Sequence, residues 1–279
     1  MKEKVKCCVV TVLLLLPLML VAQETTVMTY NIKNDSQKEG LDCWNNRKVG
    51  MIELLHKYQP NVLGVQEALH NQVEYLDSCL IDYSYVGVGR DDGKQMGEYC
   101  AIFYDKTKYE VLKEGTFWLS PTPDTARISW DAACTRICTY VLLKGQTSNE
   151  QFWVFNAHFD HVGKKARKQS SKMLLKKIRD SNMEGYPVIL MGDLNATPDK
   201  RSIGVLSREM VDAYNVIEGL KVATVGTYNG FRLEPSIKRI DYVFVKNLEV
   251  VSYVHIDERR DNNRHISDHL PVMVTVRLL

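Results

Sequence analysis

Short runs rich in β-branched and aromatic residues recur along almost the whole chain, and Gly, Pro, Asn or Asp bounds them. Such runs predict β-strands. They fall at residues 26–32, 62–66, 83–88, 100–104, 137–143, 151–157, 187–191, 240–245 and 272–278. Helical spacing of apolar residues is rarer and occurs at 45–58, 71–80 and 166–182. Because strands outnumber helices and often follow one another directly, stacked sheets with helices outside are expected, not a regular alternation of strand and helix.

Two of the helical segments predict which side is buried. The apolar stripe of the first consists of Val49, Ile52, Leu55 and Tyr58. This helix is expected to end before Pro60. The segment 166–182 is basic on one side, which suits a solvated surface better than a nucleic-acid backbone. Its buried face is expected to be Met173, Leu174, Leu175 and Ile178.

Length and composition limit the class of protein. The chain has 279 residues, of which 45% are hydrophobic and 25% are charged. These values are ordinary for a soluble globular protein, so collagen-like, low-complexity and disordered classes are excluded. Neither a linker nor a repeat divides residues 23–279, and one domain is expected there.

Residues 1–22 predict an export signal. Three lysines precede a continuous apolar run over 7–22, which is the order of a secretory signal peptide. A membrane anchor is the alternative, but the run is short for a spanning helix and Pro17 interrupts it. We therefore expect cleavage near Ala22 and a periplasmic or secreted protein. No later segment is apolar enough to predict a transmembrane helix in the mature chain.

Charge and cysteine content narrow the chemistry further. The formal net charge is +2, but residues 1–22 hold three lysines and one glutamate, so the processed chain is neutral. A local site, not a global positive field, must then attract an anionic ligand. The processed chain has an odd number of cysteines and no CxxC pair, which argues against zinc and favours buried thiols. These cysteines are Cys43, Cys79, Cys100, Cys134 and Cys138.

Polar side chains stand where several expected strands begin or end. Strand ends on one rim of a sheet converge in space, and active sites are built from such rims. The set comprises Asn31, Glu67, His158, Asp193, Asn195, Asp241, Asp268 and His269. Its oxygen-rich part suits a hard cation, most naturally Mg²⁺, and its histidines suit proton transfer or charge stabilisation. Each residue alone could cap a loop or a helix, but their joint occurrence at strand ends favours an active site.

The motifs around these residues resemble the endonuclease/exonuclease/phosphatase superfamily, which comprises deoxyribonuclease I-like metal-dependent phosphoesterases. The matching segments are MTYNIK, GVQE, GEYCAIFYD, NAHFDH, MGDLNATP, RIDYVFV and SDHLPV. They occur in the family order from about residue 26 to the end of the chain. The resemblance implies an α/β fold, a four-layer sandwich of two packed mixed β-sheets flanked by helices. Residues 115–123 are similar to the deadenylase-type exonuclease branch.

The resemblance also implies a metal site and a catalytic base. Glu67 matches the principal ligand of Mg²⁺, for which Mn²⁺ is the alternative, and Asn31 and Asp268 complete the metal site. Asp193 matches the aspartate that aligns or deprotonates the attacking water. Asn195 would orient the phosphate or a second metal.

Two histidines complete the catalytic set that the resemblance implies. His269, paired with Asp241, would stabilise the phosphoryl oxygens as a fixed cation. The pKa of His269 is therefore expected to lie above its usual value. His158 matches the second histidine of deoxyribonuclease-like members, and Glu98 would be its partner carboxylate.

Four further residues are candidates for substrate contact. Arg136 could contact phosphate, although a structural ion pair is equally expected. Trp118 could stack on a base or sugar, but packing at a sheet edge is more common. Phe231 lies in an expected loop near the rim, and Asn156 precedes His158 at its strand end.

The expected function is hydrolysis of a phosphate ester by an exported, monomeric, Mg²⁺-dependent enzyme. A nuclease acting on RNA or DNA leads, with 3′–5′ exonuclease action among the options. The alternatives are a sphingomyelinase-like phospholipase C and a phosphatase of small or sugar phosphates. A protein that binds a phosphorylated ligand without cleaving it is a remote alternative. The partner would accordingly be a nucleic acid, a phospholipid or a small phosphate.

Overall fold

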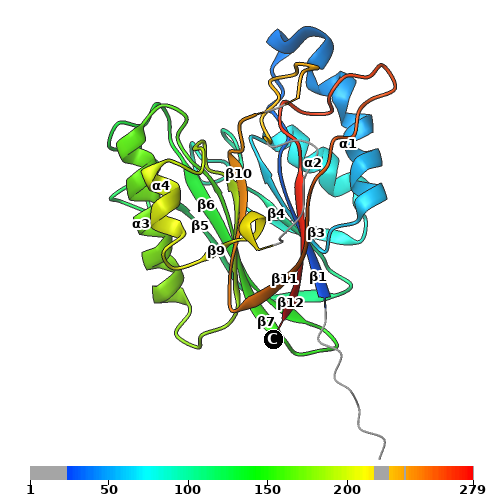
Figure 1. The fold of residues 1–279 in the computed structure, drawn as a ribbon. Helices are drawn as coiled ribbons and strands as arrows, with labels where there is room; N and C mark the ends of the chain where they lie inside the picture. The colour runs from blue at the N-terminus through cyan, green and yellow to red at the C-terminus, as the bar shows by residue number, and fades with distance from the viewer. Residues whose placement is uncertain (1–23, 217–225, 236, 279) are drawn as a thin grey trace, which may run out of the picture.

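Two six-stranded mixed sheets pack face to face and carry helices on their outer faces (Figure 1). The structure is a computed structural model, and it describes residues 24–216, 226–235 and 237–278. The expected signal peptide, residues 1–22, lies outside the described residues. Across the part of the chain that the structure describes, no helix is both long and apolar enough to cross a membrane.

Each sheet has a central pair of parallel strands between antiparallel neighbours. In spatial order, the first sheet is β11 (Leu248–His255), β12 (Val272–Leu278), β1 (Glu24–Asn31), β2 (Val62–Gln66), β4 (Ile102–Asp105) and β3 (Tyr83–Val86). The second is β5 (Tyr109–Trp118), β6 (Ile137–Gly145), β7 (Gln151–His158), β8 (Val188–Asp193), β10 (Asp241–Lys246) and β9 (Val211–Asp212).

The helices form the two outer layers. They are α1 (Trp44–Tyr58), α2 (His70–Cys79), α3 (Lys164–Ser181) and α4 (Arg201–Leu206), with short 3₁₀ turns η1 (Gln37–Asp42) and η2 (Ala213–Asn215). Helices α1 and α2 lie beside the first sheet, whereas α3 and α4 lie beside the second (Figure 1). The predicted four-layer α/β sandwich is thus confirmed.

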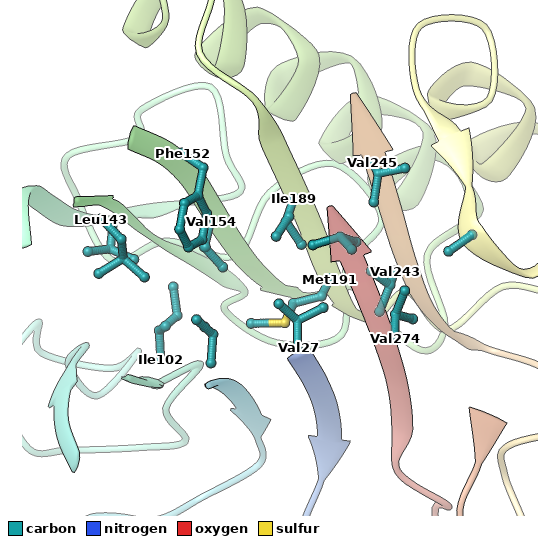
Figure 2. Packing of buried hydrophobic residues seen from close by; sticks show 14 of the residues in the cluster. Val27, Ile102, Leu143, Phe152, Val154, Ile189, Met191, Val243, Val245 and Val274 are labelled. Carbon is teal, nitrogen blue, oxygen red and sulfur yellow. The ribbon is translucent and has the colours of Figure 1, made fainter. Parts of the chain in front are cut away.

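Apolar side chains fill all three spaces between the layers. Between the sheets, Val27 and Val274 of the first sheet lie close to Ile189, Met191 and Val243 of the second (Figure 2). A second cluster joins the other face of the second sheet to α3 and α4, and a third joins the first sheet to α1 and α2. Burial of such side chains is the main favourable contribution to folding.

The strand directions bring the predicted polar residues to one rim. Because β1 is parallel to β2, the carboxyl ends of these strands share one edge of the first sheet, as those of β7 and β8 share one edge of the second. A hydrogen bond from Asn31 at the end of β1 to Asp193 at the end of β8 brings the two edges together. Strand β10 runs antiparallel to β8, and its first residue, Asp241, is paired with Asp193 at the end of β8. Strand β12 runs antiparallel to β1, so the residues just before β12, Asp268 and His269, lie near Asn31.

The structure corrects two details of the predicted elements. Val49 is exposed, because the inner face of α1 is formed by Trp44, Arg47, Met51, Leu54 and Leu55. Strands β5 and β11 were not predicted; both are edge strands with charged and exposed positions, as is usual for sheet edges. Each of the five described cysteines is unpaired, and Cys100 and Cys138 are buried as expected.

Candidate active site

A cavity of about 640 Å³ opens at the rim where these strands end. Acidic side chains, which a bound cation requires, and basic side chains, which an anionic substrate requires, both line this cavity. The predicted site residues among its walls are Glu67, Glu98, Arg136, His158, Asp193, Asn195, Asp268 and His269. The structure therefore brings most of the predicted set together.

Asn31 joins the two sheets beneath the cavity. It is completely buried at the end of β1, and its Nδ2 donates to Oε1 of Glu67 and to Oδ2 of Asp193, each at 3.0 Å. Its Oδ1 accepts the backbone N–H of Lys33 at 3.1 Å. Asn31 thus positions the two carboxylates through its amide nitrogen. Its predicted role as a metal ligand would use the second lone pair of Oδ1 and stays a prediction.

His269 and Asp241 form a buried pair. Nδ1 of His269 donates to Oδ2 of Asp241 at 2.8 Å, and both side chains are almost fully buried. Burial alone would lower the pKa of His269, but the carboxylates of Asp241 and Asp193 outweigh it and raise that pKa to about 10. His269 is therefore an imidazolium at neutral pH, a fixed positive charge at the cavity wall.

Asp193 lies between the two histidines. Its Oδ2 is 3.3 Å from Nε2 of His158 and 3.8 Å from Nε2 of His269, while Oδ1 accepts the backbone N–H of Asn195 at 2.9 Å. Burial would raise the pKa of Asp193, but these neighbours hold it well below its usual range. Asp193 is thus an ionised carboxylate that can accept a proton or a hydrogen bond from water.

The carboxylates of Glu67 and Asp268 fit a divalent cation. They come from different segments but face a common point, because Nζ of Lys33 lies 3.8 Å from Oε2 of Glu67 and 3.4 Å from Oδ2 of Asp268. A positive charge is therefore already accommodated between them. Oxygen donors of this kind suit Mg²⁺ or Mn²⁺. Glu67, His158 and Asp193 also offer ligand atoms that lie within 4.8 Å of one another.

Sequence reasoning missed Arg47, which holds the rim together from below. This arginine of α1 is completely buried, and it donates hydrogen bonds of 2.6–3.0 Å to four backbone carbonyls. The acceptors are the carbonyl oxygens of Ile32, Lys33, Asp42 and Ile266. Arg47 thus ties the segment after β1, which carries Lys33, to the segment that carries Asp268. In the sequence it is an ordinary polar residue of a helix.

Glu98 does not pair with His158, and this expectation was wrong. Its carboxylate accepts hydrogen bonds from Arg90 and from Nδ2 of Asn34, and it lies 3.8 Å from Nη1 of Arg136. Two guanidinium groups therefore neutralise Glu98, whereas His158 contacts Asp193 and Asn195.

Glu98 and Arg90 belong to a hairpin that forms one wall of the cavity. Backbone hydrogen bonds from Arg90 to Glu98 and from Asp91 to Met96 close it. Trp118 supports this hairpin from behind, because its Nε1 donates to the carbonyl oxygen of Arg90 at 2.7 Å and its side chain is 9% exposed. Trp118 is therefore placed for packing at a sheet edge, not for stacking on a substrate.

Two other predicted substrate contacts lie outside the cavity wall. Asn156 is completely buried between the sheets, where its Nδ2 donates to the carbonyl oxygens of Val65 and Ala101 at 2.9 Å. It joins the sheets and has no exposed atom for a substrate. The ring of Phe231 lies 5.6 Å from the guanidinium carbon of Arg47, so it covers that buried residue.

The cavity has further charged and aromatic side chains that the sequence did not single out. The ring of Tyr228 meets that of His269 edge-on at 5.1 Å. Arg136, as predicted, lines the wall; it is 7% exposed, and its Nη2 lies 3.1 Å from Nδ1 of His161. The additional basic groups are Lys33, Arg90, Arg167, Lys200 and Lys238. Their signal in the sequence is weak because they lie in loops and on α3, away from the strand ends.

Comparison with known proteins agrees with this geometry. A family model described as "Endonuclease/Exonuclease/phosphatase family" matches residues 28–269. An uncharacterized protein of Acanthamoeba polyphaga mimivirus is 30% identical in an alignment of 249 residues that covers 83% of this chain and 91% of that protein.

Solved structures show the same fold. An endonuclease/exonuclease/phosphatase family protein from Bacteroides thetaiotaomicron is 32% identical, with a TM-score of 0.86 over 92% of this chain and 99% of that one. The mannosyl-6-phosphatase of the same species is 33% identical, with a TM-score of 0.84 over 90% and 99% of the two chains. The human Nocturnin catalytic domain with bound sulfate has a TM-score of 0.74 over 92% and 95%, but at 19% identity it is similar in fold alone.

Proposed function

The chain belongs to the endonuclease/exonuclease/phosphatase family, whose members are metal-dependent phosphoesterases, and we propose that it is a phosphatase of small phosphorylated sugars. The observation that carries this proposal is the walled cavity of about 640 Å³, of a size for one small ligand. The hairpin of Arg90 and Glu98 bounds it on one side. The similarity to a mannosyl-6-phosphatase supports the same substrate class.

The chain's own residues provide the machinery for this reaction. Asp193, ionised and held between two histidines, orients the attacking water and takes its proton. His269, kept protonated by Asp241, stabilises negative charge on the phosphoryl oxygens. His158, whose Nε2 lies 3.3 Å from Oδ2 of Asp193, also lines the cavity and would hydrogen-bond the phosphate.

Glu67 and Asp268 would hold the metal ion, for which we propose Mg²⁺. When bound, it would polarise the phosphate and neutralise developing negative charge. The side-chain amide of Asn31 hydrogen-bonds both Glu67 and Asp193 and so fixes the position of one carboxylate relative to the other. Arg136, which lines the cavity, would add a positive charge for the phosphate group of the substrate.

Nuclease action is the second candidate, and the basic side of α3 favours it. Some of those charges are, however, already paired within the protein. Lys176 pairs with Asp180, Arg179 pairs with Glu209 at 2.8 Å, and Lys177 lies 4.9 Å from the ring centre of Tyr140. These contacts reduce the positive charge that α3 offers to a nucleic-acid backbone, and we propose the small-substrate activity first.

A substrate panel tests the proposal. Wild-type protein would be assayed with mannose 6-phosphate, glucose 6-phosphate, bis(p-nitrophenyl) phosphate, single-stranded RNA and sphingomyelin, each with Mg²⁺ or with EDTA. We expect a sugar monoester to give the highest kcat/KM and EDTA to abolish its hydrolysis. Faster turnover of RNA or of sphingomyelin than of either sugar phosphate would refute the substrate class.

A further inference from the structure

Lys33 occupies the space between the two carboxylates that would hold the metal. Its Nζ lies 3.4 Å from Oδ2 of Asp268 and 3.8 Å from Oε2 of Glu67. The side chain is only 22% exposed. Burial would lower the pKa of Lys33, but Asp268 and Glu67 raise it well above its usual range, so the group remains an ammonium. One protein cation thus balances two nearby carboxylates.

The backbone of Lys33 is built to place the ammonium there. Its φ is 57°, in the left-handed region that side-chain-bearing residues seldom adopt. Two completely buried side chains hold this conformation, because Nη2 of Arg47 and Nε2 of Gln72 both donate to the Lys33 carbonyl oxygen at 2.9 Å. The Lys33 N–H donates to Oδ1 of Asn31. Two of these three contacts come from Arg47 and Asn31, which also hold the rim.

We propose that Lys33 is an internal competitor of the metal, an ammonium that balances Glu67 and Asp268 until a divalent cation displaces it. The two positive charges cannot share this space, because like charges at such distances repel strongly. The metal therefore binds more weakly than it would to the bare carboxylates, and the metal-free protein is more stable. By thermodynamic linkage, the same coupling free energy between the ammonium and the metal sets the loss of metal affinity and the gain in stability of the metal-free protein. Lys33 also lines the cavity, so the displaced ammonium remains beside an anionic substrate.

This inference rests on the metal site of the proposed function, but not on the substrate. Its test is the dissociation constant of Mn²⁺, measured without substrate by the electron paramagnetic resonance signal of the free ion. Lys33→Met removes the charge and keeps much of the side-chain length, and Lys33→Arg keeps the charge. Lys200→Met is the matched control, because Lys200 also lines the cavity but pairs with Asp199. Glu67→Gln identifies the site.

We expect Lys33→Met to bind Mn²⁺ at least about tenfold more tightly than the wild type. Lys33→Arg and Lys200→Met should stay within about twofold, and Glu67→Gln should bind at least about tenfold more weakly. Thermal unfolding in EDTA should show a lower Tm for Lys33→Met, together with a larger rise in Tm on addition of Mn²⁺. Equal or weaker binding by Lys33→Met overturns the proposal, as does Mn²⁺ binding that is independent of Glu67. Failure of the sugar-phosphate activity would leave these affinities unchanged, so the two proposals can fail separately.

Discussion

Replacement of Arg47 by methionine should destabilise the protein by about 3–5 kcal/mol. The variant leaves four backbone carbonyls without their donor, and an orphaned buried polar group costs roughly 1–3 kcal/mol. The sum is an upper bound for two reasons. The bond to the Lys33 carbonyl is only partly buried, so water can replace it. Removal of the guanidinium also relieves the cost of burying its charge.

Urea unfolding of metal-free protein, followed by circular dichroism, measures this difference. A loss of that size corresponds to a fall in Tm of about 6–20 °C. Lys48→Met is the matched control, because Lys48 lies on the same helix with its Nζ 3.1 Å from Oδ1 of Asn45 at the surface, and it should change stability by less than about 0.5 kcal/mol. A change below about 1 kcal/mol for Arg47→Met would show that the four hydrogen bonds are not what holds this rim.

Three further outcomes follow from the site and the sequence. In metal-free protein, Asp241→Asn should lower the pKa of His269 by at least about two units. This shift means that the free-energy preference for the imidazolium over the neutral imidazole falls by roughly 3 kcal/mol. The raised wild-type pKa of about 10 stabilises the fold fully below pH 6.5, the unfolded value, and this contribution is lost as the pH rises through 10. An NMR titration that finds the same pKa in both proteins would refute the pairing. Trp118→Ala should raise the KM for a sugar phosphate about tenfold with a smaller change in kcat, because the hairpin of Arg90 loses its support; an unchanged KM would contradict that support. If residues 1–22 are a signal peptide, expression of the full chain should yield an exported protein that begins near residue 23. Recovery of uncleaved protein in the membrane fraction would favour an anchor.

The positions of the candidate site residues were predictable because these residues stand at strand ends. Asn31, Asp193 and His269 stand next to apolar runs whose pattern fixes their direction, and parallel neighbours place their carboxyl ends on one edge of a sheet. The pairing of His269 with Asp241 also follows from the family motifs. The motifs do not predict which atom of each side chain makes the contact. In Asn31 it is the amide nitrogen that donates to both carboxylates.

The contacts that hold the rim were not predictable in the same way. Arg47 donates to carbonyls that lie as far as 219 positions away in the chain, and no local pattern marks such acceptors. Glu98 was assigned to His158 by motif, but Arg90 and Arg136 lie closer and carry full positive charges. Strands β5 and β11 escaped prediction because polar residues interrupt them, so that neither contains an apolar run of more than two residues.

The most direct test of the hydrolytic site is inorganic phosphate release from mannose 6-phosphate by the wild type and by Asp193→Asn, both in Mg²⁺. Asparagine keeps the shape of the side chain but cannot take a proton from water. We expect kcat to fall by about 10²–10⁴, the range typical of a lost general base, while KM changes little. Retention of more than about a tenth of the wild-type kcat would contradict the assignment of Asp193 and, with it, the proposed site of phosphate hydrolysis.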